Sequence, residues 1–113
     1  MNSYKYEEVS AAMVDLLEAA VQEGSTHNVP GTSAAFESAL RRLRVLSNAD
    51  ESFSIAALGE IRRTVAMVDV MNLNFHPKSR EGLAHQAYIR RVLPGMLDER
   101  KNAFLAVRDK DCG

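Results

Sequence analysis

The segment from Ser79 to Tyr88 contains an arginine and a histidine whose types and spacing suit phosphate chemistry. Arg80 stands five residues before His85, close to where a helix is expected to begin. Histidine can take up or give a proton near neutral pH, and an arginine guanidinium stabilises negative charge that builds on a phosphate group. The amino end of a helix also attracts phosphate. Arg80 and His85 are therefore a candidate catalytic pair.

The sequence REGLAH at residues 80–85 resembles the signature of the HEPN family, small all-helical domains many of which are ribonucleases that need no metal ion. The resemblance implies that two protomers bring their arginine–histidine pairs together. The segment departs from the common family pattern at Glu81, where a small polar residue is usual, and at Tyr88, which stands three rather than two residues after the histidine. Positions five apart on an ideal helix differ by about 140°, so the pair shares one site only if Arg80 bends back at the helix start. The alternative is a solvated Arg80 and a partly buried His85.

A second candidate site comes from arginine, which supplies ten of the fourteen basic residues. The arginines that could converge from two expected helices into a surface for an anion or RNA are Arg41, Arg42, Arg44, Arg90 and Arg91. Few aromatic residues are interleaved with them, which disfavours a stacking platform for single-stranded nucleic acid. The alternative is that these arginines lie on solvated faces and pair with nearby acids such as Glu37 and Glu60.

Charge and composition disfavour several other classes of function. The net charge is −1, with one basic and five acidic side chains in residues 1–30 and thirteen basic and ten acidic ones in residues 31–113. A dedicated DNA-binding domain is usually far more basic. The three histidines lack a zinc-ligand spacing, no serine or cysteine has the glycine frame of a nucleophile, and no glycine-rich phosphate loop is present. We therefore expect neither a metal ion nor a cofactor.

The cysteine content and the apolar runs favour a cytoplasmic protein. The single cysteine, Cys112, cannot form an intramolecular disulfide, which fits a reducing compartment. The polar N-terminus has no signal-peptide pattern, and no apolar run is long enough to span a bilayer. We expect a cytoplasmic location and no membrane partner.

Apolar periodicity predicts an all-α, single-domain bundle of four or five helices over residues 1–113, with a frayed tail at about 109–113. The first helix is expected at Tyr4–Glu23, with its core stripe formed by Val9, Ala12, Met13, Leu16, Leu17, Ala20 and Val21. The expected caps of the next three helices are Thr32 or Ser33, Ser52 or Ser54, and Ser79. Pro94 is expected to kink or break the last helix, or to begin a new one.

The third expected helix carries apolar residues on two sides. Met67 and Met71 lie about 100° from its main stripe, so this helix is either central in the bundle or has a second apolar face for a partner. The second possibility leads to our main hypothesis, a binding protein of the adaptor, regulator or inhibitor type that bacteria and mobile elements encode in short reading frames. A homodimer would cover the methionine face. A metal-independent ribonuclease and noncatalytic nucleic-acid binding are the alternatives.

Overall fold

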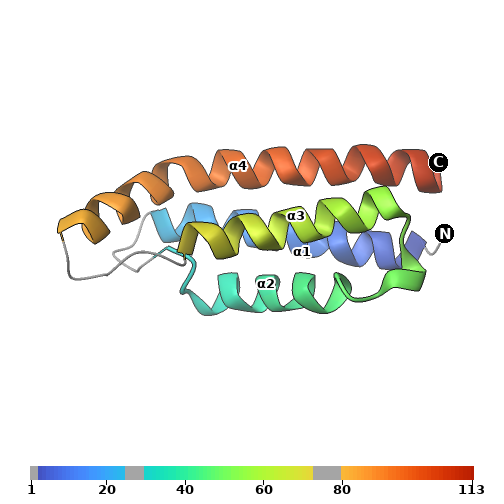
Figure 1. Cartoon of the computed structure of the whole chain (residues 1–113), viewed down its shortest axis with the longest axis horizontal. Helices are drawn as coiled ribbons and strands as arrows, with labels where there is room; N and C mark the ends of the chain where they lie inside the picture. Colours follow the sequence, from blue (N-terminus) through green and yellow to red (C-terminus); the bar gives the residue numbers. More distant parts are fainter. Residues whose placement is uncertain (1–2, 25–29, 73–79) are drawn as a thin grey trace.

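The protein is an all-α bundle of four helices in the residues that the computed structural model describes, which are 3–24, 30–72 and 80–113 (Figure 1). The helices are α1 (Ser3–Gly24), α2 (Ala34–Leu46), α3 (Ile55–Asn72) and α4 (Arg80–Cys112), with a short 3-10 turn at Asp50–Ser52 before α3. Successive helices run in opposite directions, so that the start of α1 and the end of α4 lie at the same end of the molecule (Figure 1). The sequence therefore predicted the fold class correctly.

The helices form a ring in which each contacts two neighbours. α1 packs closely against α2 and α4, α3 packs against α4, and α2 and α3 make the loosest of the four contacts. α2 and α4 are consequently diagonal, at opposite edges of the bundle in Figure 1. Residues of α2 and residues of α4 thus face different sides of the molecule.

Most of the core follows the predicted stripes, with one clear correction in α1. Its residues Val9, Ala12, Met13, Leu16 and Ala20 are buried as expected. Val21 was expected on the same stripe, but 56% of its surface is exposed. Val21 lies five positions after Leu16, which places it about 140° around the helix from that core residue. One apolar residue therefore belongs to the outer face of α1 rather than to the core.

Serine side chains cap the second and third helices. Ser33 Oγ accepts a hydrogen bond from the Phe36 amide at 3.2 Å, and Ser54 Oγ accepts one from the Ala57 amide at 3.1 Å. These bonds satisfy amide groups that have no partner within the helix. Each cap is one of the two residues predicted for it. The third predicted cap, Ser79, lies outside the described residues.

Pro94 does not end a helix, because α4 continues through it to Cys112. Of the alternatives expected at Pro94, a break that begins a fifth helix is therefore not observed, and the kink within one helix remains. A proline removes one hydrogen bond and crowds the preceding turn, and a helix can tolerate this when packing on both sides holds it in place. Leu93 and Leu97, which flank the proline, are both buried against the other helices. The first part of α4 is inclined relative to the rest (Figure 1), so the outcome is a bent continuous helix. Its last turn contains residues 109–112, which were expected to be frayed.

A polar network ties together three helices at the end of the bundle that holds the chain's ends. The buried Tyr6 hydroxyl donates to Asp111 Oδ2 at 2.7 Å and accepts the Ser54 amide at 3.1 Å. Ser54 Oγ donates to the same carboxylate oxygen at 2.6 Å. The Tyr6 ring packs against Phe53 and Phe104, with ring centroids 5.1 and 5.8 Å away. One tyrosine therefore joins α1, the start of α3 and the end of α4.

Candidate functional site

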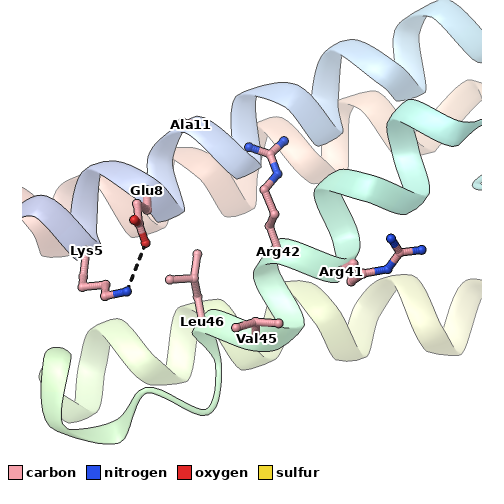
Figure 2. A pocket seen from close by; sticks show the side chains of 7 residues that line it. All are labelled: Lys5, Glu8, Ala11, Arg41, Arg42, Val45 and Leu46. Carbon is pink, nitrogen blue, oxygen red and sulfur yellow. Dashed lines mark hydrogen bonds and ion pairs between the residues drawn. The ribbon is translucent and has the colours of Figure 1, made fainter.

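An open groove of about 530 Å³ lies between α1 and α2 (Figure 2). One short segment of each helix lines the groove. The lining residues are Lys5, Glu8 and Ala11 of α1, and Arg41, Arg42, Val45 and Leu46 of α2. The residues on each helix recur at three- or four-residue steps, which puts them on one face. The groove is thus built by two regular helices and not by a loop.

The floor of the groove is apolar. Leu46 is buried and belongs to the core, while Val45 beside it has 68% of its surface exposed. Ala11 supplies the facing wall, and its small side chain leaves room between the helices. A valine this exposed on a regular helix is unremarkable by itself. Its position at the edge of an apolar hollow is what makes it a candidate anchor point for a ligand.

The rim of the groove carries three cations and one acid. Lys5 Nζ lies 3.4 Å from Glu8 Oε2, and the Arg42 side chain extends toward α1 (Figure 2). One of its guanidinium nitrogens lies 2.6 Å from Asp15 Oδ2 of that helix. Arg41 is exposed, and no carboxylate pairs with it among the described residues. The local charge is therefore positive, although the whole chain carries a net charge of −1.

Sequence reasoning found two of the groove residues but not the groove. Arg41 and Arg42 were predicted as part of an anion or nucleic-acid surface. The sequence did not indicate that α1 forms the other wall of the groove. Lys5 lies beside the end of α2 only because α1 and α2 pack antiparallel. The adjacent Val45 and Leu46 were the one signal in the sequence for an apolar surface at this place. Neighbouring helix residues point about 100° apart, so one of the two is expected to lie outside the core.

The candidate catalytic residues Arg80 and His85 lie near the start of α4. Arg80 is the first residue of the helix and is exposed. His85 is half-buried, with its Nε2 atom 3.0 Å from the backbone oxygen of Met71. Since a carbonyl can only accept, Nε2 carries the proton and donates it to one of the last carbonyls of α3. This bond gives His85 a structural task, the tethering of α4 to the end of α3.

The five arginines of the predicted nucleic-acid surface fall into two separate groups. Arg41, Arg42 and Arg44 are on α2, and Arg90 and Arg91 are on the diagonal helix α4. The α2 group is partly engaged, because Arg42 pairs with Asp15 and Arg44 makes a bidentate pair with Asp69. In the α4 group, the Arg91 guanidinium carbon lies 5.6 Å from the centre of the Tyr88 ring. The structure does not bring the five into one patch.

The predicted interface methionines are packed against the core. Met67 and Met71 are both half-buried and contact the buried cluster of the bundle. Both side chains are therefore partly covered within the bundle. Two other large apolar residues of α3 are exposed, Ile55 with 93% and Val70 with 68% of their surface.

Searches for other kinds of site, and for relatives, add no further candidate. Within residues 3–24, 30–72 and 80–113, no three histidine, cysteine or acidic side chains are grouped closely enough to hold a metal ion. In the same residues, no helix combines the length and the apolar character needed to cross a membrane. Comparison of the chain with models of known protein families, with curated proteins and with solved structures finds no significant match.

Proposed function

We propose that the protein works by binding another protein, and that the α1–α2 groove takes an amphipathic helix of the partner. The observation that supports this most directly is the apolar lining of Ala11, Leu46 and, at the edge of the groove, Val45, with cationic side chains around it. A helix lying in a groove between two helices is a common mode of peptide recognition. Apolar anchors in the middle of a charged rim are also the usual anatomy of a protein interface.

The groove accommodates one to two turns of a partner helix. Its lining residues span positions 5–11 of α1 and 41–46 of α2, which corresponds to about 8–9 Å along each helix. A partner helix presents apolar side chains at i, i+3, i+4 and i+7 on one face. Two of these would be enough to cover Val45 and the hollow beside it. The partner segment is therefore expected to be short and to have one apolar face.

The charge of the rim favours acidic residues beside those anchors. Arg41 projects from the rim without a carboxylate partner among the described residues. Lys5 and Arg42 are paired with Glu8 and Asp15, so the excess positive charge of the rim comes from Arg41. Acidic side chains next to the apolar anchors would complement this rim, whereas basic ones would be repelled. We therefore assign the partner as an acidic amphipathic helix.

Two matched synthetic peptides test this assignment. Both have about 14 residues and the same leucine positions, and their polar positions are glutamate in one and lysine in the other. Binding is measured by fluorescence anisotropy at low and moderate salt. We expect the acidic peptide to bind about tenfold more tightly than the basic one, with a preference that weakens as salt rises. Because the protein itself is slightly negative, general charge attraction would give the opposite order.

Variants of the groove separate specific binding from adhesion to the surface. Val45→Glu places a charge at the apolar edge of the groove and should weaken binding of the acidic peptide about tenfold or more. Val70→Glu is the matched control, because Val70 is as exposed as Val45 but lies on α3. Equal binding by wild type and Val45→Glu, or binding by neither peptide, would overturn the proposal.

A further inference from the structure

A second hollow, of about 260 Å³, lies between α1 and α2 and continues the groove. Arg42 lines both hollows, and its ion-pair partner Asp15 lines the second. The two hollows together cover positions 5–22 of α1 and 35–46 of α2, which corresponds to about 25 Å and 17 Å along the two helices. We call this combined surface the α1–α2 seam. A helix of about 14 residues, or 21 Å, matches its length.

The α1 wall of the seam is negative. Glu18 lines the second hollow, is exposed, and has no cation paired with it in the part of the chain that the structure describes. The other two acids of this wall are neutralised in the ion pairs Lys5–Glu8 and Arg42–Asp15. Glu18 is therefore the acid of α1 that is available to a ligand in the seam.

The α2 wall of the seam is positive. Arg42 extends toward α1 and Arg41 does not (Figure 2), so that Arg41 is the available cation of this wall. Glu37 lies one turn before Arg41 but lines neither hollow. The dipoles of α1 and α2 oppose each other, because the two helices run in opposite directions (Figure 1). Side chains, and not helix ends, therefore give the two walls their opposite charges.

We propose that the partner helix is acidic along the edge that faces α2 and basic along the edge that faces α1, and that this pattern fixes the direction in which the helix lies. The inference rests on the proposed function, because it concerns the same partner. Charged residues on either side of an apolar line set the orientation of paired helices in coiled coils. Reversing the helix on its apolar face exchanges its two edges. The reversed helix would set acids against Glu18 and bases against Arg41, which disfavours that direction.

A mixed peptide with glutamate along one edge and lysine along the other tests the charge pattern. It has the leucine positions of the acidic peptide described above, and both are compared by fluorescence anisotropy at low salt. We expect the wild type to bind the mixed peptide about threefold more tightly, since Glu18 then faces lysine instead of glutamate. Glu18→Lys should reverse this preference.

Glu99→Lys is the matched control for the overall charge of the protein. Glu99 is exposed on α4, which is diagonal to α2, and its replacement changes the net charge by the same amount. This variant should keep the preference of the wild type for the mixed peptide. If the acidic peptide binds but Glu18→Lys and Glu99→Lys show the same preference, this inference is overturned and the proposed function stands. Binding of neither peptide would overturn both.

Two mirror peptides test the direction of the bound helix. They have the same composition, and the glutamate and lysine edges are exchanged between them, so the two should bind in opposite directions. A dye on Ala35→Cys in a Cys112→Ser background reports one end of the seam, because Ala35 lines the second hollow. A quencher on the N-terminus of each peptide should dim the dye strongly with one peptide and weakly with the other. Equal quenching by both bound peptides would contradict a fixed direction.

Discussion

Replacing Tyr6 with phenylalanine should destabilise the protein by removing one oxygen atom from the end of the bundle. The ring and its contacts with Phe53 and Phe104 are kept, because phenylalanine has the same shape. The hydroxyl lost is the one that donates to Asp111 at 2.7 Å and accepts from the Ser54 amide at 3.1 Å. The variant therefore tests the polar network alone.

The expected cost follows from these two bonds. A hydrogen bond to a charged group contributes about 1.5–3 kcal/mol, and an amide left without its partner costs about 1 kcal/mol or more. The Asp111 carboxylate keeps its bond from Ser54 and stays partly in contact with water, which reduces the total. We expect a loss of about 2 kcal/mol. For 113 residues the unfolding entropy is about 0.24 kcal/mol per degree, so the midpoint temperature should fall by about 8 °C.

The dependence of this loss on pH identifies the groups involved. The hydrogen bonds from Ser54 and then Tyr6 lower the pKa of the Asp111 carboxyl below its ordinary value. A lowered pKa gives stability that is present above the unfolded value of about 3.9 and is lost as the pH falls through the folded value. Burial, and then the bond to Asp111, raise the pKa of the Tyr6 phenol. That contribution is present below about pH 10 and is lost as the pH rises through the folded value.

Calorimetry or circular dichroism of the two proteins from pH 3 to pH 10.5 is the assay. The difference between wild type and Tyr6→Phe should be largest near neutral pH and should narrow at both extremes. Tyr88→Phe is the control, because Tyr88 is exposed and its ring contact with Arg91 does not need the hydroxyl. A Tyr6→Phe midpoint within about 1 °C of the wild type at pH 7 would refute the reasoning. A difference that stays constant down to pH 3 would exclude the carboxylate as its source.

Three further changes test other parts of the structure. Glu23→Gln should lower the free energy of unfolding in urea by about 1–2 kcal/mol. The buried Glu23 carboxylate accepts hydrogen bonds from two backbone amides of the α1–α2 connection, at 2.6 and 2.8 Å. An unchanged urea midpoint would contradict this prediction. His85→Ala should lower the free energy of unfolding by about 1 kcal/mol, because the hydrogen bond to α3 is lost. An RNA-cleavage assay without metal ions, with wild type, His85→Ala and Arg80→Ala, tests the ribonuclease hypothesis. That hypothesis requires that the wild type cleaves RNA and that both variants do not. Pro94→Ala should stabilise α4 by about 1–3 kcal/mol in thermal unfolding, since it restores a backbone bond within a continuous helix; a loss of stability would show that packing requires the bend.

Local signals in the sequence predicted the fold well, while features built from distant residues were missed. The caps Ser33 and Ser54 were among the predicted residues because a cap is decided within four positions of the chain. The contact of Tyr6 with Asp111 joins residues 105 positions apart, and nothing in the periodicity of either helix indicates it. The groove was missed for the same reason, since its walls come from two helices whose relative position is a tertiary property.

The exposed apolar residues of α1 are a different case, because the signal for Val21 was present in the sequence and was misassigned. Val21 was grouped with the core by its three- and four-residue steps, although it also lies seven positions after Val14. When a helix has apolar residues on two faces, the residues of each face recur at steps of three and four, so the sequence alone does not tell the faces apart. In the structure the burial of Leu16 and the exposure of Val21 distinguish the core face from the outer face.

The abundance of arginine has a structural explanation in the order of the helices. Each neighbouring pair of helices is joined by one arginine and one carboxylate: α1–α2 by Asp15 and Arg42, α2–α3 by Arg44 and Asp69, α3–α4 by Glu60 and Arg100, and α4–α1 by Arg108 and Glu7. Each exposed pair contributes at most about 1 kcal/mol to stability. Their larger effect is on specificity, because apolar stripes of similar composition do not determine which helix lies beside which, whereas a wrong neighbour would leave these charges opposed or unmatched. Two of the arginines that indicated an RNA surface in the sequence, Arg42 and Arg44, are thus among the four that favour one order of the helices. Arg41, which has no such task among the described residues, is the one that remains available to the groove.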